Sequence, residues 1–218
     1  MNLSLSLSFE EANHPLVAQV RARLQDLCRA RPLHARFLNM LSLLEHIGSR
    51  KIMSSQAMDQ PDQDLLKHLA EEARHAFFFK RAAERMALRT LDYSAEHTMA
   101  ALSAQLYMGR LDVEISRKVG TSVGALPYLY MSLIVELRAV WIYRIYQLVL
   151  MEQKIALTLK SILAEEELHL NAMLARIQEL DREADSRIAL FSEIEAIQFH
   201  ALWAEIEEEC SVYRLAAE

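Results

Sequence analysis

Residues that interrupt helices are scarce in this sequence. Only four of its 218 residues are glycine and four are proline, and these two types are the least favourable in a helix interior. Alanine, leucine, glutamate and arginine, which favour helices, are abundant. The composition therefore predicts an all-α chain. The length suits a single domain, residues 1–218, with a full-sized core.

Cysteine is equally scarce. Cys28 and Cys210 do not have the spacing of a disulfide framework or of a metal motif, which favours a reducing, cytoplasmic location. The opening residues, MNLSLSLSFEE, lack the basic region and long apolar core of a signal peptide. The net charge of −6 is spread along the chain, which argues against a nucleic-acid groove.

Long apolar runs without charge are also missing. The most apolar stretch, Leu126–Met151, carries Glu136, Arg138 and Arg144. Charged side chains are rare in the middle of membrane helices, so we expect this stretch to form a buried bundle helix and no membrane span.

The sequence does contain one short motif twice. Glu72 and His75 stand three residues apart in LAEEARHAFFF, and Glu166 and His169 do so in LAEEELHLNAML. Residues with this spacing leave the same face of a helix, so a carboxylate and an imidazole can bind one metal ion together. A single Glu-x-x-His pair arises often by chance in a Glu-rich helix, and the repetition is therefore the informative feature.

Each pair is preceded by a glutamate in an apolar helix. Glu45 lies 27 residues before Glu72, and Glu136 lies 30 residues before Glu166. The sequence therefore predicts a duplicated helix hairpin, with a lone glutamate on the first helix and Glu-x-x-His on the second. Four-helix bundles of this kind hold two metal ions in ferritin-like carboxylate proteins.

The alternative interpretation of each residue alone is an ordinary solvated side chain. It fails for Glu45 and Glu136, because both interrupt apolar helix faces, where an unpaired buried carboxylate is unfavourable by several kcal/mol. Four such carboxylates without a metal would repel one another. A degenerate bundle that has lost its metals remains the main alternative, and such a bundle would typically lack at least one ligand.

The expected helices follow from apolar periodicity and from helix-starting residues. Within residues 1–12, leucine and serine alternate and acidic residues follow, which predicts a frayed end or a short extended arm. An N-terminal helix at about 14–30 precedes a bundle core at about 33–183, and a C-terminal helix at about 186–213, capped by Asp185-Ser186, ends the chain. Within the core we predict four bundle helices, at about 33–57, 61–88, 128–150 and from the turn Met151–Lys154 to Glu183. Between the second and the third we predict a crossover helix at about 95–118 and a loop at Gly120–Pro127.

This pattern resembles the ferritin-like di-iron carboxylate superfamily. Its members include ferritins, rubrerythrins, aldehyde-deformylating oxygenases, tRNA-modifying and ubiquinone-pathway hydroxylases, and bacterial multicomponent monooxygenases. The resemblance implies a four-helix bundle with a long crossover, extra terminal helices and two iron ions, with manganese as an alternative at one or both sites. Each lone glutamate would share an ion with the histidine of its own copy, while the glutamates of the two Glu-x-x-His pairs bridge the ions. The six implied ligands are Glu45, Glu72, His75, Glu136, Glu166 and His169.

Residues around the implied ligands match the superfamily in part. Glu71 and Arg74 give the first copy the acid-Glu-x-Arg-His form of the monooxygenases, in which the extra acid orients a histidine. The second copy has Glu165 in the place of the acid but Leu168 in the place of the arginine.

Two further residues are candidates. Tyr143, seven residues after Glu136, resembles the tyrosine of the Glu-x-x-Ala-x-x-x-Tyr helix in ferritins and rubrerythrins, which implies a catalytic role; the first copy has Ile52 there. His68, one turn before Glu72, is either a seventh ligand or an ordinary histidine at the rim of the site, which is the commoner case.

The resemblance does not name the member. A rubredoxin-type Cys-x-x-Cys is absent from the sequence, and the chain is longer than a minimal ferritin subunit. Gly48 and Ala139 each follow a lone glutamate by three residues, which either leaves space for dioxygen or a substrate or allows close helix packing.

We therefore expect an oxidase or oxygenase that activates dioxygen and oxidises an unidentified organic substrate, with an electron donor protein as a further partner and a homo-oligomer, such as a dimer, as the assembly. The alternatives are a ferroxidase or iron store, and a structural bundle held by its metal.

Overall fold

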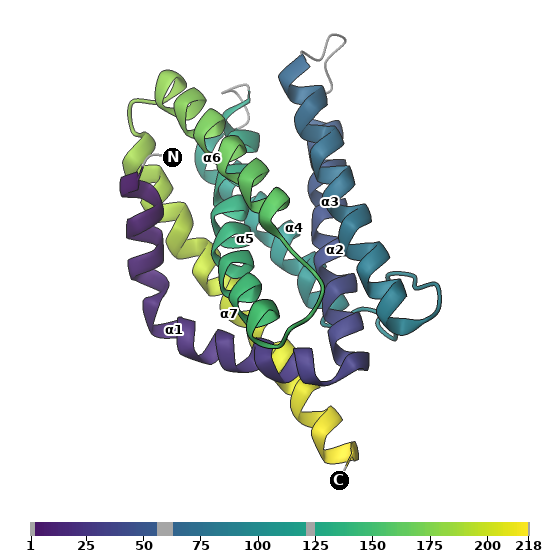
Figure 1. Cartoon of the computed structure of the whole chain (residues 1–218). Helices are drawn as coiled ribbons and strands as arrows, with labels where there is room; N and C mark the ends of the chain where they lie inside the picture. Colours follow the sequence, from purple (N-terminus) through teal and green to yellow (C-terminus); the bar gives the residue numbers. More distant parts are fainter. Residues whose placement is uncertain (1–2, 56–62, 121–124, 218) are drawn as a thin grey trace. The chain divides into compact units, whose positions relative to one another are not determined.

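The computed structural model describes residues 3–55, 63–120 and 125–217. This described part contains seven α-helices and no strand, which confirms the prediction of an all-α chain and is compatible with a ferritin-like bundle (Figure 1). The predicted turn around Pro61 and the centre of the predicted loop at 121–124 lie outside it. The helices are α1 Leu3–Arg29, α2 Arg31–Ser55, α3 Gln63–Ala87, α4 Ala101–Val119, α5 Leu126–Glu152, α6 Lys160–Leu180 and α7 Ala184–Ala217.

The chain divides into two compact units. Unit 1 comprises Met1–Gln25 and Leu111–Ala196, and unit 2 comprises Asp26–Arg110 and Ile197–Glu218. Each unit contains one of the predicted hairpins: α2 and α3 belong to unit 2, and α5 and α6 belong to unit 1. The duplication seen in the sequence is therefore also a division of the structure.

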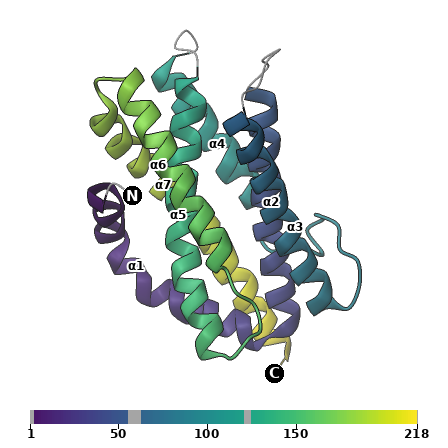
Figure 2. The same cartoon turned by 45° about the horizontal axis from the view of Figure 1, so that its top comes forward.

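The hairpin of unit 2 is formed by α2 and α3, which lie side by side and run in opposite directions (Figures 1 and 2). Pro32 stands in the first turn of α2, where its missing N–H is not needed. Phe79 on α3 is fully buried, and burying a side chain of this size contributes about 1.5–3 kcal/mol. The Nε of Arg31 donates to the carbonyl of Met86 over 2.7 Å, and Leu88, with a φ of 58°, takes the left-handed conformation that commonly ends a helix.

The segment after α3 corrects one prediction, because residues 95–100 form turns and α4 begins at Ala101. The side-chain amide of buried Asn39 donates hydrogen bonds to two backbone carbonyls of this segment, those of Asp92 (2.7 Å) and His97 (3.0 Å). The Asp92 carboxylate accepts from the backbone N–H of Ser94 over 3.0 Å. These bonds fix the backbone in turns, where helix propensity alone suggests an earlier helix start.

The hairpin of unit 1 is formed by α5 and α6, which also lie side by side in both views (Figures 1 and 2). Most residues of α5 are buried all round the helix, as expected for a helix at the centre of a core. The link to α6 is longer than predicted, because a turn at Gln153–Lys154 leads to a stretch without regular secondary structure. Helix α6 then runs from Lys160 to Leu180 instead of reaching Glu183. The N–H of Leu159, just before α6, donates to the side chain of Gln147 over 2.6 Å.

The two terminal helices are longer than predicted. Helix α1 begins at Leu3, so residues 3–12 are helical and the prediction of a frayed or extended segment was wrong. Phe9 is buried, and Glu10 pairs with Arg144 of α5 within unit 1. Helix α7 begins at Ala184 and continues to Ala217, so Asp185 lies in its first turn instead of capping it.

Across the described residues, no helix combines the length and the apolarity needed to cross a lipid bilayer. This agrees with the prediction for the apolar stretch 126–151.

Candidate metal centre

Unit 2 brings Glu45, Glu72 and His75 together, and we call these three residues the α2–α3 trio. Glu72 and His75 leave one face of α3 because they are three residues apart, and the adjacent α2 supplies Glu45. Each residue offers one ligand atom within 4.8 Å of the others, and Oε1 of Glu72 lies 3.9 Å from Nδ1 of His75. All three are buried.

A hydrogen bond and a glycine allow α2 and α3 to lie close together near this trio. The hydroxyl of Ser42, one turn before Glu45, donates to the carbonyl of Ala76 over 2.7 Å. A Cβ placed on Gly48 would lie 3.3 Å from Oε2 of Glu72. The space beside Gly48 is therefore taken by the Glu72 carboxylate, which supports the close-packing explanation of this glycine.

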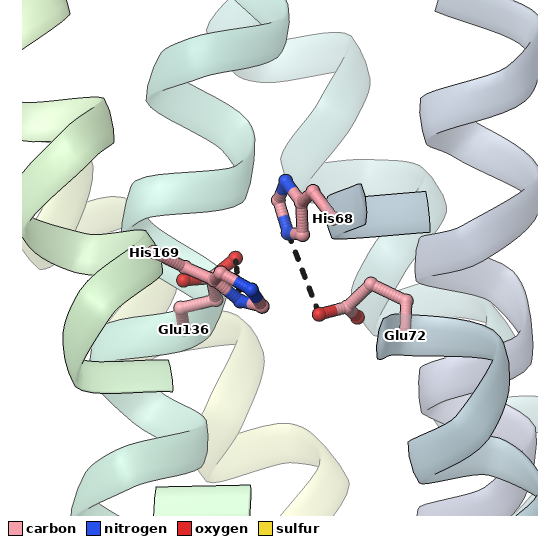
Figure 3. Close-up of side chains that lie close together, drawn as sticks. All are labelled: His68, Glu72, Glu136 and His169. Carbon is pink, nitrogen blue, oxygen red and sulfur yellow. Dashed lines mark ion pairs between the residues drawn. The ribbon is translucent and has the colours of Figure 1, made fainter. Parts of the chain in front are cut away.

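His68 lies near the same carboxylate. Its Nε2 is 3.4 Å from Oε1 of Glu72, and only 13% of its side chain is exposed. Figure 3 shows the His68 ring turned toward Glu72, one turn along α3. His68 is thus within reach of an ion held by Glu72, and both the ligand and the rim interpretation stay open.

Unit 1 brings Glu136 and Glu166 close to His169, and we call these three residues the α5–α6 trio. Nδ1 of His169 lies 3.2 Å from Oε2 of Glu166 and 3.9 Å from Oε1 of Glu136. Figure 3 shows the second of these pairs, with Glu136 on α5 and His169 on α6. All three side chains are buried, so each hairpin carries a buried cluster of two glutamates and a histidine that could bind metal.

The geometry of each trio fits a metal ion. Oxygen and nitrogen atoms held at about 2.0–2.2 Å from one ion lie roughly 3–4.3 Å from each other. The distances of 3.2 and 3.9 Å in the α5–α6 trio fall in this range, as does the 3.9 Å distance in the α2–α3 trio. Carboxylate and imidazole donors together suit iron or manganese.

Arg138 is a residue of this region that the sequence did not explain. It is buried on α5, two residues after Glu136, and its Nε and Nη2 donate to the two oxygens of Glu195 over 2.8 and 2.7 Å. Its Nη1 donates to Asn13 over 2.8 Å. Glu195 therefore balances the charge of Arg138 within unit 1, and the arginine inside an apolar run was the sequence signal for such a partner.

The positions beside the predicted ligands that differ between the two copies, Arg74 and Leu168, lie on the surface. The side chain of Arg74 is 50% exposed and lies 3.9 Å from Glu71, and Leu168 is also exposed. The arginine-to-leucine difference between the two copies therefore concerns the outer surface of the helices. The orienting role of Glu71 stays a prediction.

Tyr143 is buried on α5. It lies two turns from Glu136, or about 10 Å along the helix axis. Its predicted catalytic role stays a prediction, and the equivalent residue Ile52 on α2 is buried as well.

Comparison of the chain with protein-family models, with curated proteins and with solved structures returned no match. The candidate centre therefore rests on the residues of the two trios themselves.

Proposed function

We propose that the two trios together hold two metal ions, iron in the first instance, in an enzyme that activates dioxygen to oxidise an organic substrate. The observation that carries this proposal is that each hairpin holds two buried glutamates close to a buried histidine. A ferritin-like arrangement would unite the two trios in one centre, as the resemblance implies.

Charge balance supports two ions over one. The four carboxylates of the trios carry four negative charges, and two divalent ions neutralise them while both imidazoles stay neutral. Buried charge without such compensation is strongly unfavourable. The Arg138 guanidinium is already balanced by Glu195, so it does not perform this role.

Each trio residue has a defined task in the proposal. The two lone glutamates and the two histidines would each hold one ion, and Glu72 and Glu166 would bridge the ions. When bound, two ferrous ions supply two electrons to dioxygen. The protein side chains bind and orient the ions and keep the centre shielded from water.

The proposal is tested by metal content. Purified protein supplied with iron should contain close to two ions per chain, and Glu72→Ala or His169→Ala should lower this content sharply, because each removes a ligand from one trio. Glu205→Ala changes an exposed glutamate of α7 and should leave it unchanged. Elemental analysis makes the comparison, and protein without bound metal would overturn the proposal.

A ferroxidase with the same ligands is the second candidate, favoured by the resemblance to ferritins. Ferrous titration in air separates the two functions. An oxygenase should consume dioxygen once, retain its two irons and stay a small oligomer. Many irons per chain in a large hollow particle would establish the ferroxidase instead.

A further inference from the structure

Helix α3 has an apolar stripe on the face opposite its trio. Leu66, Ala70, Ala73 and Phe77 follow one another at intervals of four, three and four residues, so they form one continuous line along the helix. All four are exposed, Leu66 to 50% and Phe77 to 62%. Because the four side chains follow one line, their exposed apolar area is continuous, and continuous apolar patches mark interaction sites more often than single exposed residues do.

A row of basic residues runs beside this stripe. Lys67, Arg74 and Arg81 are spaced by seven residues, which keeps them on one side of the helix with a drift of about 20° per step. The side chains of Lys67 and Arg74 are 62% and 50% exposed, and Arg81 is exposed. We call the stripe and this row together the outer face of α3.

The acidic residues near this face offset its positive charge only in part. The side chain of Glu71 is only 15% exposed and lies 3.8 Å from Lys67 and 3.9 Å from Arg74. Glu84 lies near the end of α3, where it accepts a hydrogen bond from the N–H of Leu91 over 3.1 Å, and the three basic residues of the row still outnumber Glu71 and Glu84. The outer face of α3 is therefore basic on a chain whose net charge is −6.

We propose that the outer face of α3 docks a small acidic protein that carries one electron at a time. This inference rests on the proposed function, because an oxygenase must recover electrons after each turnover: two reduced carriers, each losing one electron, return two ferric ions to two ferrous ions. An acidic carrier is repelled by the negative net charge of the chain and attracted by the basic row, so the charges both select and orient it.

The position of the face suits this task. Glu72 and His75 leave the opposite side of the same helix, so a carrier docked on α3 is separated from them by about one helix diameter, roughly 10 Å. The apolar stripe supplies the part of the interface from which water is excluded, with Phe77 as its aromatic anchor. The basic row supplies the charged rim.

The first experiment measures binding. The probe is a plant-type [2Fe–2S] ferredoxin of negative net charge, titrated by calorimetry into the full-length protein at low and at physiological salt. Binding should weaken as salt rises, and the double variant Lys67→Glu/Arg81→Glu should weaken it at least tenfold at low salt. Phe77→Ala should weaken it with little change in the salt dependence.

The matched control is Arg110→Glu, which reverses the charge of an exposed arginine on α4 and should leave binding within twofold of the unaltered protein. All these positions are exposed, and circular dichroism verifies the fold of each variant. Equal binding by the double variant and the unaltered protein would overturn the docking surface.

The second experiment measures electron transfer. Stopped-flow oxidation of reduced ferredoxin by the iron-loaded protein should slow at least tenfold in Lys67→Glu/Arg81→Glu, while dithionite should reduce the bound iron of both proteins at the same rate. If iron loads normally and the ferredoxin rates are equal, the docking surface is wrong and the proposed function stands. If no iron binds, the proposed function is wrong, and the binding titration still decides whether α3 docks an acidic protein.

Two other occupants would also overturn the proposal. Vesicles of anionic phospholipid that bind the protein through Phe77 and Lys67, when ferredoxin does not, would assign the face to a membrane surface. A dimer that Phe77→Ala dissociates in sedimentation experiments would assign it to a second copy of the chain.

Discussion

A single missing methyl group sets how closely α2 approaches the carboxylate of Glu72. With a Cβ at position 48 only 3.3 Å from Oε2 of Glu72, that carboxylate would have to shift by a few tenths of an ångström. Gly109 on α4 offers the comparison, because a Cβ there would meet nothing within 4 Å. Both glycines lie inside helices, and only Gly48 touches a predicted ligand.

We predict that Gly48→Ala lowers the affinity for iron or manganese by about tenfold, the lower end of the effect of disturbing residues that support a metal ligand. Gly109→Ala should leave the affinity unchanged and stabilise the metal-free protein by about 0.5–1 kcal/mol, because alanine favours a helix over glycine. Metal titration and urea unfolding measure the two effects. Equal metal affinity in both variants would show that Gly48 is not a spacing residue of the site.

For single residues, the sequence was sufficient to predict which side chains of the same helix lie together. The spacing of Glu72 and His75 requires only a helix to bring them together, and the structure does so. The role of Gly48 stayed open because it depends on the distance between α2 and α3, which no local pattern encodes. The partner of Arg138 lies 57 residues away on α7, and composition does not identify it.

At the scale of elements, the start of α2 contains a buried histidine that links stability to pH. Burial lowers the pKa of His34 from 6.5 to about 4. The unfolded chain therefore binds more protons than the folded chain between these values, and His34 favours unfolding as the pH falls. The contribution of neutral His34 to stability is fully present above about pH 6.5 and falls by roughly 3 kcal/mol as the pH approaches 4.

We predict that His34→Gln reduces this acid-induced loss of stability, because glutamine takes up no proton in this range. Urea unfolding of metal-free protein at pH 7.5, 6 and 5 measures it, as the difference between variant and unaltered protein at each pH. His200→Gln changes an exposed histidine of α7 and serves as the control. If the three proteins lose stability in parallel, the burial of His34 is not what links its proton uptake to folding.

Element boundaries were predictable where local signals and packing agree. The strongly apolar α5 was placed within two residues at each end. The beginning of α1 was missed because alternating leucine and serine has the period of a strand. In the structure this segment is helical, with Phe9 buried and Glu10 paired with Arg144 within unit 1. The start of α4 was missed because Asn39, distant in sequence, binds the preceding turns.

At the scale of the whole molecule, the proposed centre would draw half of its ligands from each unit. An ion that binds only the folded protein stabilises it in proportion to the logarithm of its concentration over its Kd. We predict that chelation lowers the Tm and increases hydrogen exchange in both α3 and α6. The Glu72→Ala variant, which lacks one of the six ligands, should respond much less to the chelator. An unchanged Tm in the unaltered protein would mean that the carboxylates do not share an ion.

The chain order of the Arg138 cluster has a consequence for protein synthesis. Asn13, Arg138 and Glu195 meet in unit 1, yet Arg138 leaves the ribosome well before Glu195 has been made. Unit 2 is completed later still, since Glu209 pairs with Arg36 over 2.7 Å. Neither unit can therefore finish folding during translation before α7 has been made, because α7 contributes to both. The nascent chain therefore carries Arg138 on an apolar helix without its carboxylate partner until α7 has been made, and that unfinished chain is the form a chaperone would meet.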